Sequence, residues 1–332
     1  MKRLISLIII AILSLSLVAC GQEESPAEAK EIRIGYMAGP TGMGMAKLIH
    51  DNGGVEGNAT YKFTKYTDTN TAKADLAANK IDLICLPTNE AAAYYNQFNG
   101  SINVLAVNCL NSLYLLSDSA NTITSLSVLE GKTVYTCKNG TPRLILEYIL
   151  KENGINATVS YEINGKTILT PADVGTLVVS GELPIAVMPE PIITSSLLTI
   201  AKNGDSSISY SVDLDLADGW STALGEDATP ITMGCVVASS DFVKKNGKLI
   251  SAFLAEYNES IEFIGNSENL QIAADYVVET GVMAAKPAAI KALTNLGDAI
   301  AYIDGADMKE ALVKFYEVIG LKLPDEKFYY IP

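Results

Sequence analysis

Residues 32–49 read IRIGYMAGPTGMGMAKLI. The apolar run from Ile32 to Met37 has the length of a β-strand, a glycine-rich turn follows it, and a helix is expected from about Met43 to Asp51. The same succession of strand, short polar turn and helix returns several times along the chain. This alternation predicts an α/β fold, in which ligands usually bind beyond the carboxyl ends of the strands.

Four predicted strands run directly into a polar turn and then into the start of a helix. Two of these turns fall in each half of the chain, at residues 39–44, 87–90, 136–142 and 189–191. In the third turn, Thr141 is expected to be the N-cap and Pro142 the first helical residue. Free backbone N–H groups at helix starts can bind polar ligand atoms. Each turn alone can simply cap its helix, but four together favour two half-sites that face each other across a cleft.

Three other segments complete the outline of the chain. The uncharged run from Val104 to Leu116 is expected to be extended, and the chain after Asp241 is expected to be mostly helical. Residues Asp213–Asp227 read as an acidic loop that carries Trp220, the only tryptophan. Trp220 is expected either to close over a flat ligand or to pack in the core, and the sequence leaves both alternatives open.

The N-terminus predicts export and anchoring. Two positive residues precede an apolar run from Leu4 to Val18, which is shorter than the about 20 residues of a membrane span and typical of a secretory signal. The run closes with Leu17–Gly21, which resembles a bacterial lipobox. That resemblance implies a signal peptide over residues 1–19 and lipidation of Cys20, followed by a flexible tether over residues 20–30.

Charge and cysteine content exclude several classes of function. The formal net charge is −14, and removal of Lys2 and Arg3 with the signal peptide takes it to −16, which argues against nucleic acid and against electrostatic binding to anionic lipid. No C-x-x-C spacing occurs, and we expect neither a metal nor a cofactor. The other cysteines lie in strand-like runs, which favours four reduced core thiols over a disulfide: Cys85, Cys109, Cys137 and Cys235.

An ordered series of short motifs carries a resemblance over nearly all of the chain after the tether. The segments are Ile32–Ile49, Ala77–Leu83, Thr88–Ala92, Leu129–Val134, Ser180–Pro184, Val187–Pro191 and Val237–Phe242. In this order they resemble the solute-binding proteins of sulfonate, taurine, nitrate and thiamine-precursor importers. The resemblance implies a two-lobed type II periplasmic-binding-protein fold. Lobe 1 would hold residues 31–109 and 235–332, and lobe 2 residues 112–231, joined by a hinge of two crossing strands near Asn108–Leu113 and Thr232–Val236.

The resemblance also implies a function and a set of binding residues. The chain would be the extracytoplasmic component of an ABC importer, a monomer held on the outer face of the membrane through Cys20. It would bind a small organic molecule between the lobes, either a nitrogen heterocycle such as a thiamine precursor or a sulfonate-like compound, and pass it to the permease subunits. Ligand-binding positions carried over from the family are Thr41, Gly42, Met43, Thr88, Asn89, Asn111, Tyr114, Asn139, Thr141 and Glu190. Trp220 is added to this set as a residue able to close over the ligand.

The charged residues favour a neutral or cationic ligand. Arg33 and Arg143 are the arginines that remain after the signal peptide, and neither is placed for a bidentate anion clamp. Glu190 in the fourth turn favours an amine or a protonated ring nitrogen. The alternative for Glu190 is that its carboxylate stabilises the start of its own helix.

Two other classes of function remain as alternatives. An enzyme needs a base, and His50, the only histidine, falls at the end of an amphipathic helix. No G-x-S-x-G or H-E-x-x-H motif occurs, and the turn at residues 39–45 has Met45 where a phosphate-binding loop has lysine. A lipoprotein that senses a ligand and contacts a membrane receptor is the other alternative.

Overall fold

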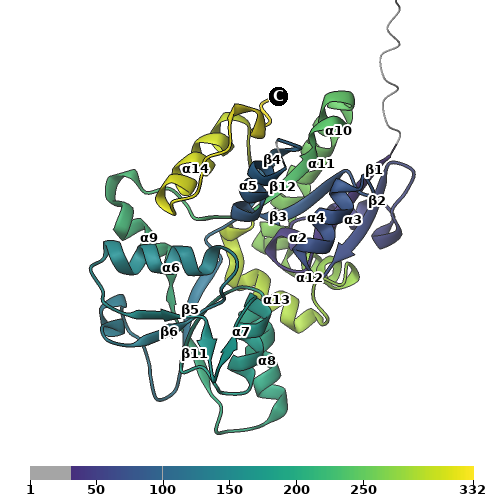
Figure 1. Cartoon of the computed structure of the whole chain (residues 1–332). Coiled ribbons are helices and arrows are strands. Elements are labelled where there is room, and N and C mark those ends of the chain that lie inside the picture. The colour runs from purple at the N-terminus through teal and green to yellow at the C-terminus, as the bar shows by residue number, and fades with distance from the viewer. Residues whose placement is uncertain (1–30, 99) are drawn as a thin grey trace, which may run out of the picture.

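The computed structural model describes residues 31–332 except residue 99. Two β-sheets, each flanked by helices, form two lobes that lie side by side (Figure 1). We call the part built on the six-stranded sheet lobe 1 and the part built on the five-stranded sheet lobe 2. The predicted signal peptide, the lipidated Cys20 and the tether lie outside the described residues. Within the described ranges, no helix is both long and apolar enough to cross a membrane.

Lobe 1 contains the sheet β13-β4-β12-β3-β1-β2. Its strands are β1 (Ile32–Met37), β2 (Tyr61–Tyr66), β3 (Leu83–Pro87), β4 (Ile102–Leu110), β12 (Thr232–Ser239) and β13 (Ile303–Asp304). Its helices are α2 (Pro40–Met43), α3 (Ala46–Asp51), α4 (Thr69–Ala77), α5 (Thr88–Gln97), α10 (Ser240–Lys245), α11 (Gly247–Gly265), α12 (Leu270–Glu279), α13 (Lys286–Leu296) and α14 (Gly305–Val318). Strand β1 pairs in parallel with β2 and β3, whereas β12 runs antiparallel between β3 and β4.

Alternating side chains of this sheet enter two apolar clusters. Leu83 and Cys85 of β3 belong to the cluster under α3, α11 and α12, while Ile84 and Leu86 belong to the cluster under α5 and α14. This is the two-residue period of a strand buried on both faces. The predicted continuous helix from Met43 is wrong at its start, since the chain forms the short α2 and then α3, separated by Gly44 and Met45.

Lobe 2 contains the sheet β11-β5-β10-β6-β7. Its strands are β5 (Leu113–Asp118), β6 (Thr133–Tyr135), β7 (Thr158–Ser160), β10 (Ile185–Pro189) and β11 (Tyr210–Asp215), with a separate hairpin of β8 (Glu162–Ile163) and β9 (Lys166–Thr167). Its helices are α6 (Thr141–Glu152), α7 (Pro171–Val179), α8 (Ile192–Asn203) and α9 (Leu216–Leu224). Helices α7 and α8 cover one face of the sheet, and α6 and α9 cover the other.

Two neighbouring segments join the lobes. The run predicted as one extended segment from Val104 to Leu116 is divided at Asn111 and Ser112, so that β4 belongs to lobe 1 and β5 to lobe 2. Asn111 has a φ of 40°, a left-handed conformation that asparagine tolerates better than most residues. Its backbone N–H donates to the Ile231 carbonyl (3.0 Å), and its Oδ1 accepts from the Ile231 N–H (2.9 Å). The outgoing and returning connections are therefore bonded to each other.

The acidic segment Asp213–Asp227 is not the predicted loop. It holds the end of β11, helix α9 and the 3₁₀ turn η3 (Gly225–Asp227). Trp220 on α9 is 0% exposed, and its indole N–H donates to the Thr229 carbonyl at 2.7 Å. Its ring packs against Tyr148 of α6 and Phe315 of α14, with ring centroids 5.1 and 5.7 Å away. Trp220 therefore joins lobe 2 to the C-terminal helix and does not cover the space between the lobes.

Candidate binding site

A cavity of about 830 Å³ lies between the two lobes. Lobe 1 contributes the turns after β1, β2 and β3, together with Cys109, Met233 and Val282. Lobe 2 contributes the turn before α6, the turn after β10, and one side of both α7 and α8. All four turns singled out in the sequence supply residues to this wall. The volume is within the range of roughly 300–1,000 Å³ that is common for pockets binding small organic ligands.

The turn after β1 divides its residues between the cavity and the core. Gly39, Pro40 and Thr41 line the cavity. Met43, by contrast, is 0% exposed in the core of lobe 1. At Gly42 an added Cβ would lie 2.0 Å from the Met37 carbonyl oxygen, so glycine is required there by close packing. Of the three residues predicted in this turn, the structure brings only Thr41 to the cavity.

The turn after β3 contributes Pro87 and Glu90, not the two predicted residues. Thr88 is buried, and its hydroxyl donates to the Thr232 carbonyl at 2.6 Å, which fastens the start of α5 to β12. Asn89 lies beside it but does not line the cavity. The Glu90 carboxylate, which does, forms an ion pair with Lys73 of α4 at 2.8 Å.

The turn before α6 lies in the cavity wall as predicted, with Asn139 and Thr141 both in the lining. The helix nevertheless begins one residue earlier than expected. Gly140, with a φ of 90°, is the N-cap, and Thr141 is the first helical residue. The Thr141 hydroxyl donates to the sulfur of Met233 at 3.8 Å, a contact from lobe 2 to lobe 1.

Three other predicted residues serve to connect parts of the protein. Asn111 is bonded to the returning connection at Ile231. The hydroxyl of Tyr114 in β5 donates to the carbonyl of Asn295 in α13 at 3.2 Å, and Trp220 is enclosed between α6 and α14. None of these three lines the cavity.

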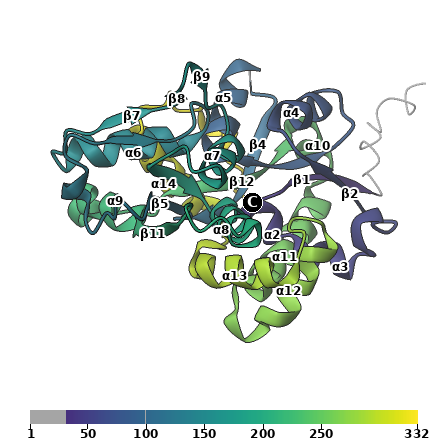
Figure 2. The same ribbon diagram turned by 90° about the horizontal axis from the view of Figure 1, so that it is seen from below.

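Glu190 lines the cavity and connects the lobes. It follows β10, its side chain is 1% exposed, and its backbone N–H donates to the Ser112 carbonyl (3.1 Å). Oε2 accepts from the Thr194 N–H (3.1 Å), and Oε1 accepts from the Thr194 hydroxyl (2.9 Å). Oε1 also accepts from the side-chain amide of Asn295 in α13 (2.6 Å), and α13 lies beside α8 in both views (Figure 2).

Most of the residues that form the lobe 2 wall of the cavity were not predicted from the sequence. This wall consists mostly of small or polar side chains at helical spacing, with the apolar Val179 and Ile192 among them: Ala172, Gly175, Thr176 and Val179 on α7, and Ile192, Ser195, Ser196 and Thr199 on α8. An added Cβ at Gly175 would lie 2.8 Å from Cγ2 of Ile192, so these helices pack closely. The turn after β2, from Thr67 to Asn70, was missed too. The recurrence of small residues every three to four positions was the available signal.

The charged side chains in the cavity lining are all acidic. They are Asp68, Glu90 and Glu190, and no lysine, arginine or histidine lines this part of the described structure. Asp68 caps α4 by accepting from the Thr71 N–H at 2.8 Å.

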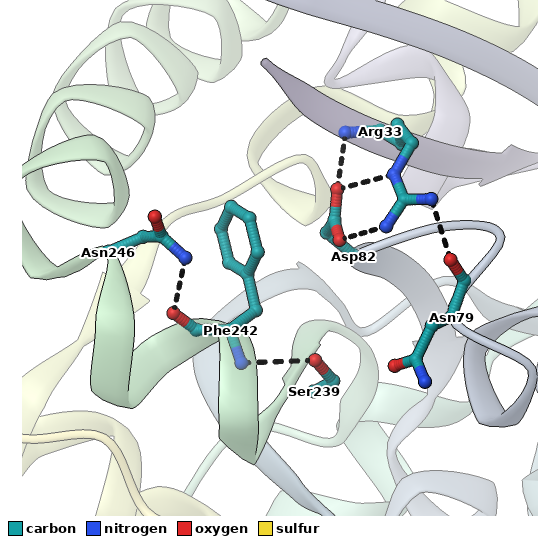
Figure 3. A network of polar contacts seen from close by, with 6 residues as sticks. All are labelled: Arg33, Asn79, Asp82, Ser239, Phe242 and Asn246. Atoms are coloured by element: carbon teal, nitrogen blue, oxygen red, sulfur yellow. Dashed lines mark hydrogen bonds and ion pairs between the residues drawn. The ribbon is translucent and has the colours of Figure 1, made fainter. Parts of the chain in front are cut away.

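Both arginines of the described chain are engaged elsewhere. The Arg33 guanidinium donates to both carboxylate oxygens of Asp82, at 2.9 and 2.6 Å, and to the Asn79 carbonyl at 2.6 Å (Figure 3). Arg143 binds both carboxylate oxygens of Glu147 on its own helix, at 2.8 and 2.9 Å. Neither residue lines the cavity, which agrees with the expectation that neither forms an anion clamp.

Groups suited to covalent or metal chemistry do not gather in the cavity. His50 stacks on Tyr276 and lies 2.8 Å from Glu279, within lobe 1 and outside the lining. Cys109 lines the cavity, but burial raises the pKa of its thiol to about 12, so it stays protonated at neutral pH. Across residues 31–98 and 100–332, no group of three or more His, Cys, Asp or Glu side chains is arranged to hold a metal ion. The arrangement is suited to binding.

The four cysteines of the described chain are free thiols, and all four are buried. Cys109 and Cys235 lie on neighbouring strands at the crossing between lobes. The Cys109 thiol donates to the Ser112 hydroxyl at 3.4 Å, and the Cys235 thiol to the Leu86 carbonyl at 3.6 Å.

The chain matches no protein-family model and no curated protein. Among solved structures, it is similar to an ABC transporter from Parabacteroides distasonis, with a TM-score of 0.70 and 19% identity over 91% of this chain and 99% of that one. The periplasmic aliphatic sulphonate binding protein SsuA from Escherichia coli gives a TM-score of 0.66 and 18% identity, covering 92% and 93% of the two chains. The periplasmic nitrate-binding protein NrtA from Synechocystis gives 0.57 and 15%, covering 85% and 75%. These likenesses show the two-lobed type II periplasmic-binding-protein fold.

Proposed function

We propose that this protein is the extracytoplasmic solute-binding component of an ABC importer. The observation that carries the proposal is the cavity between the lobes, whose wall comes from strand-end turns of both sheets. A small molecule there contacts both lobes at once. Its binding therefore favours the arrangement in which the lobes are close together, and that arrangement is what permease subunits would recognise.

The connections between the lobes suit this motion. Two adjacent segments, at residues 111–112 and 228–231, carry the chain from one lobe to the other. Residues 31–109 with 235–332 would move as one body, and residues 112–231 as the other. In this proposal Thr41, Asn139, Thr141 and Glu190 contact the ligand, since all four line the cavity. A lipid on Cys20 would hold the protein at the outer face of the membrane as a monomer.

Binding is tested on the full chain in a mild non-ionic detergent, by thermal unfolding with a panel of small molecules. The panel contains pyrimidines, thiamine precursors, alkyl sulfonates, nitrate, amines and amino acids. A ligand present at 100 times its Kd stabilises the folded state by about 2.7 kcal/mol, which raises the unfolding temperature by several degrees. Saturable stabilisation by one chemical class is the expected result.

Two matched variants locate the binding to the cavity. Thr176 lines the cavity on α7 and Thr222 lies on α9 outside it; both are exposed, and each hydroxyl donates to the carbonyl four residues earlier, at 3.0 and 2.8 Å. Thr176→Trp places an indole ring in the cavity and should strongly reduce the stabilisation, whereas Thr222→Trp should preserve it. Equal binding by both variants, or no stabilisation by any compound, contradicts the proposal.

The importer role is tested separately from binding. The lipidated protein with its ligand should associate in membranes with the permease subunits, and it should do so more weakly without ligand. Association with a signalling receptor instead would identify a sensor.

A further inference from the structure

Glu190 is a buried carboxylate with no cationic partner in the described part of the chain. Its three hydrogen-bond donors are the Thr194 N–H, the Thr194 hydroxyl and the Asn295 amide, all neutral. No ion pair of the described residues includes it. Buried charges in proteins are generally paired, because removal of a charge from water is costly without an opposite charge nearby. The position therefore calls for a counter-charge.

Helix α8 supplies only part of that charge. The start of a helix acts as roughly half of a positive elementary charge, and the Thr194 N–H belongs to this helix start. About half of the negative charge on Glu190 therefore remains without compensation. The other acidic residues of the lining differ, because Glu90 is paired with Lys73 and Asp68 is an exposed N-cap.

The carboxylate also has room for one more donor. A carboxylate offers about four acceptor positions. Oε1 accepts two hydrogen bonds, from Thr194 and Asn295, whereas Oε2 accepts one. Glu190 lines the cavity, and Oε2 is the carboxylate oxygen with fewer hydrogen bonds, so we infer that its open position can accept a donor from a ligand.

The other residues of the cavity lining limit which kind of cationic ligand can bind. No phenylalanine, tyrosine or tryptophan is among the described residues that line the cavity, so it holds no aromatic cage for a quaternary ammonium. A cation here must instead donate an N–H to Glu190. Apolar side chains from both lobes, including Met37, Leu169, Ile192 and Met233, would surround the remainder of the molecule.

We propose that the ligand is a protonated amine with an apolar body, whose N–H donates to Oε2 of Glu190. This inference rests on the proposed solute-binding function and specifies its substrate class. The names of some structural neighbours refer instead to sulphonate or nitrate. Those anions would meet a lining whose charged side chains are all acidic.

The test compares three probes that share one apolar body: 2-phenylethylamine, 2-phenylethanol and 2-phenylethanesulfonate. Calorimetric titration of the full chain should show that the amine binds at least about tenfold more tightly than either of the others. Glu190→Gln removes the charge and keeps one oxygen, which can accept from the Thr194 hydroxyl and the Asn295 amide, while its NH2 group faces the Thr194 N–H. It should weaken amine binding by about 30-fold or more and abolish the preference, as expected for loss of one member of a buried charge pair. Glu259→Gln, the same change at an exposed glutamate of α11 outside the cavity, should retain the preference.

A second pair of variants leaves Glu190 unchanged. Ser195→Lys adds a positive charge at an exposed position of the lining, and Thr222→Lys adds the same charge outside the cavity. Ser195→Lys should weaken the amine and strengthen the sulfonate, and Thr222→Lys should do neither.

The outcomes distinguish this inference from the function on which it rests. The substrate class is overturned if the alcohol or sulfonate binds as tightly as the amine, or if the preference survives Glu190→Gln. It is also overturned if the amine fails to bind at millimolar concentration while a neutral or anionic compound of the wider panel binds. In those cases the solute-binding function still holds if the compound that binds the parent protein binds Thr176→Trp more weakly. Failure of every compound contradicts the function itself.

Discussion

Asp82, directly before β3, and Glu190, directly after β10, are both buried carboxylates, yet their surroundings differ. Asp82 in lobe 1 is 6% exposed and receives the Arg33 guanidinium and backbone N–H (Figure 3). Glu190 in lobe 2 is 1% exposed and receives only neutral donors. Asp82 is therefore a completed structural ion pair between β1 and the start of β3, whereas Glu190 retains charge that a ligand can balance.

The groups around Asp82 form a structural network, whereas Glu190 lies at the cavity. The hydrogen bond to Asp82 raises the pKa of Arg33 above its ordinary value, so the guanidinium stays charged over the whole accessible pH range. The Ser239 N–H donates to the Asp82 carbonyl at 3.0 Å, and the Ser239 hydroxyl caps α10 by accepting from the Phe242 N–H at 3.3 Å. The network thus holds β1, β3 and α10 together, while Glu190 faces a cavity.

Removal of the cation from the completed pair should give the largest effect. Arg33→Met leaves the Asp82 carboxylate buried without its charge partner. We expect a loss of about 3 kcal/mol of unfolding free energy, at the lower end for buried pairs because the Arg33 side chain is 38% exposed. Urea denaturation measures it. Arg143→Met, which removes a surface pair on one helix, should cost less than about 0.5 kcal/mol. Equal losses in Arg33→Met and Arg143→Met would mean that the Arg33–Asp82 pair contributes no more to stability than a surface pair does.

The same chemical change at both carboxylates tests the comparison directly. Asp82→Asn removes the charge opposite Arg33 and should cost about 2 kcal/mol. Glu190→Gln should cost about 1 kcal/mol without added ligand, because it leaves no cation unpaired and loses only the hydrogen bond from the Thr194 N–H. Urea unfolding of both variants under one condition gives the two values. A larger loss at Glu190 would identify that carboxylate as structural and remove the reason to expect a counter-charge from a ligand.

The link between the lobes should have a smaller effect. Asn295→Ala removes the amide that reaches from α13 to Glu190. Because Asn295 is an exposed residue, we expect a loss of about 1 kcal/mol in chemical unfolding. Thr294→Ala changes the adjacent residue, whose hydroxyl bonds within its own helix to Ile290 at 2.8 Å, and should cause no loss. If neither variant changes the free energy of unfolding, the Asn295–Glu190 contact does not hold the lobes together.

The smallest effect concerns alkaline pH. Burial, and then the carboxylates of Asp215 and Glu190, raise the pKa of Tyr114 above its ordinary value of 10.0. The raised pKa contributes stability below pH 10, and this stability is lost as pH rises further, since the unfolded chain then releases a proton that the folded protein retains. Unfolding free energy measured from about pH 9 to pH 11 should fall.

Tyr114→Phe should make this decline shallower, because it removes a group whose pKa is higher in the folded protein than in the unfolded chain. Asp82→Asn, in the other lobe, should leave the slope as it is in the parent protein. A slope unchanged in Tyr114→Phe would show that Tyr114 does not contribute to the decline.

Elements with a strong local pattern were predictable from the sequence. The predicted strand Ile32–Met37 coincides with β1, and the turns after the strands were located because proline, glycine and threonine mark them locally. Strand β11 and helix α9 were not predicted. Strand β11 lies at a sheet edge with several exposed residues, and edge strands lack the apolar run that marks a central strand.

The candidate site was predictable only at the level of its turns. All four predicted turns reach the cavity, but Met43 and Thr88 within them face the interior, because a turn of a few residues directs neighbouring side chains to opposite sides. The walls formed by α7 and α8 depend on how closely those helices approach at Gly175. That approach depends on residues distant in sequence, so no local pattern specifies which helix side remains uncovered.

By itself, the sequence determined the alternation of strands and helices, the excess of negative charge and the presence of Glu190 at the start of a helix, since these depend on residue order and composition. The tertiary structure decided which carboxylate has a cation. Asp82 and Arg33 are 49 positions apart and Glu190 and Asn295 are 105 positions apart, so only the folded chain determines these partners. The energy of a buried charge depends on distance and burial, and neither quantity can be obtained from separation along the chain.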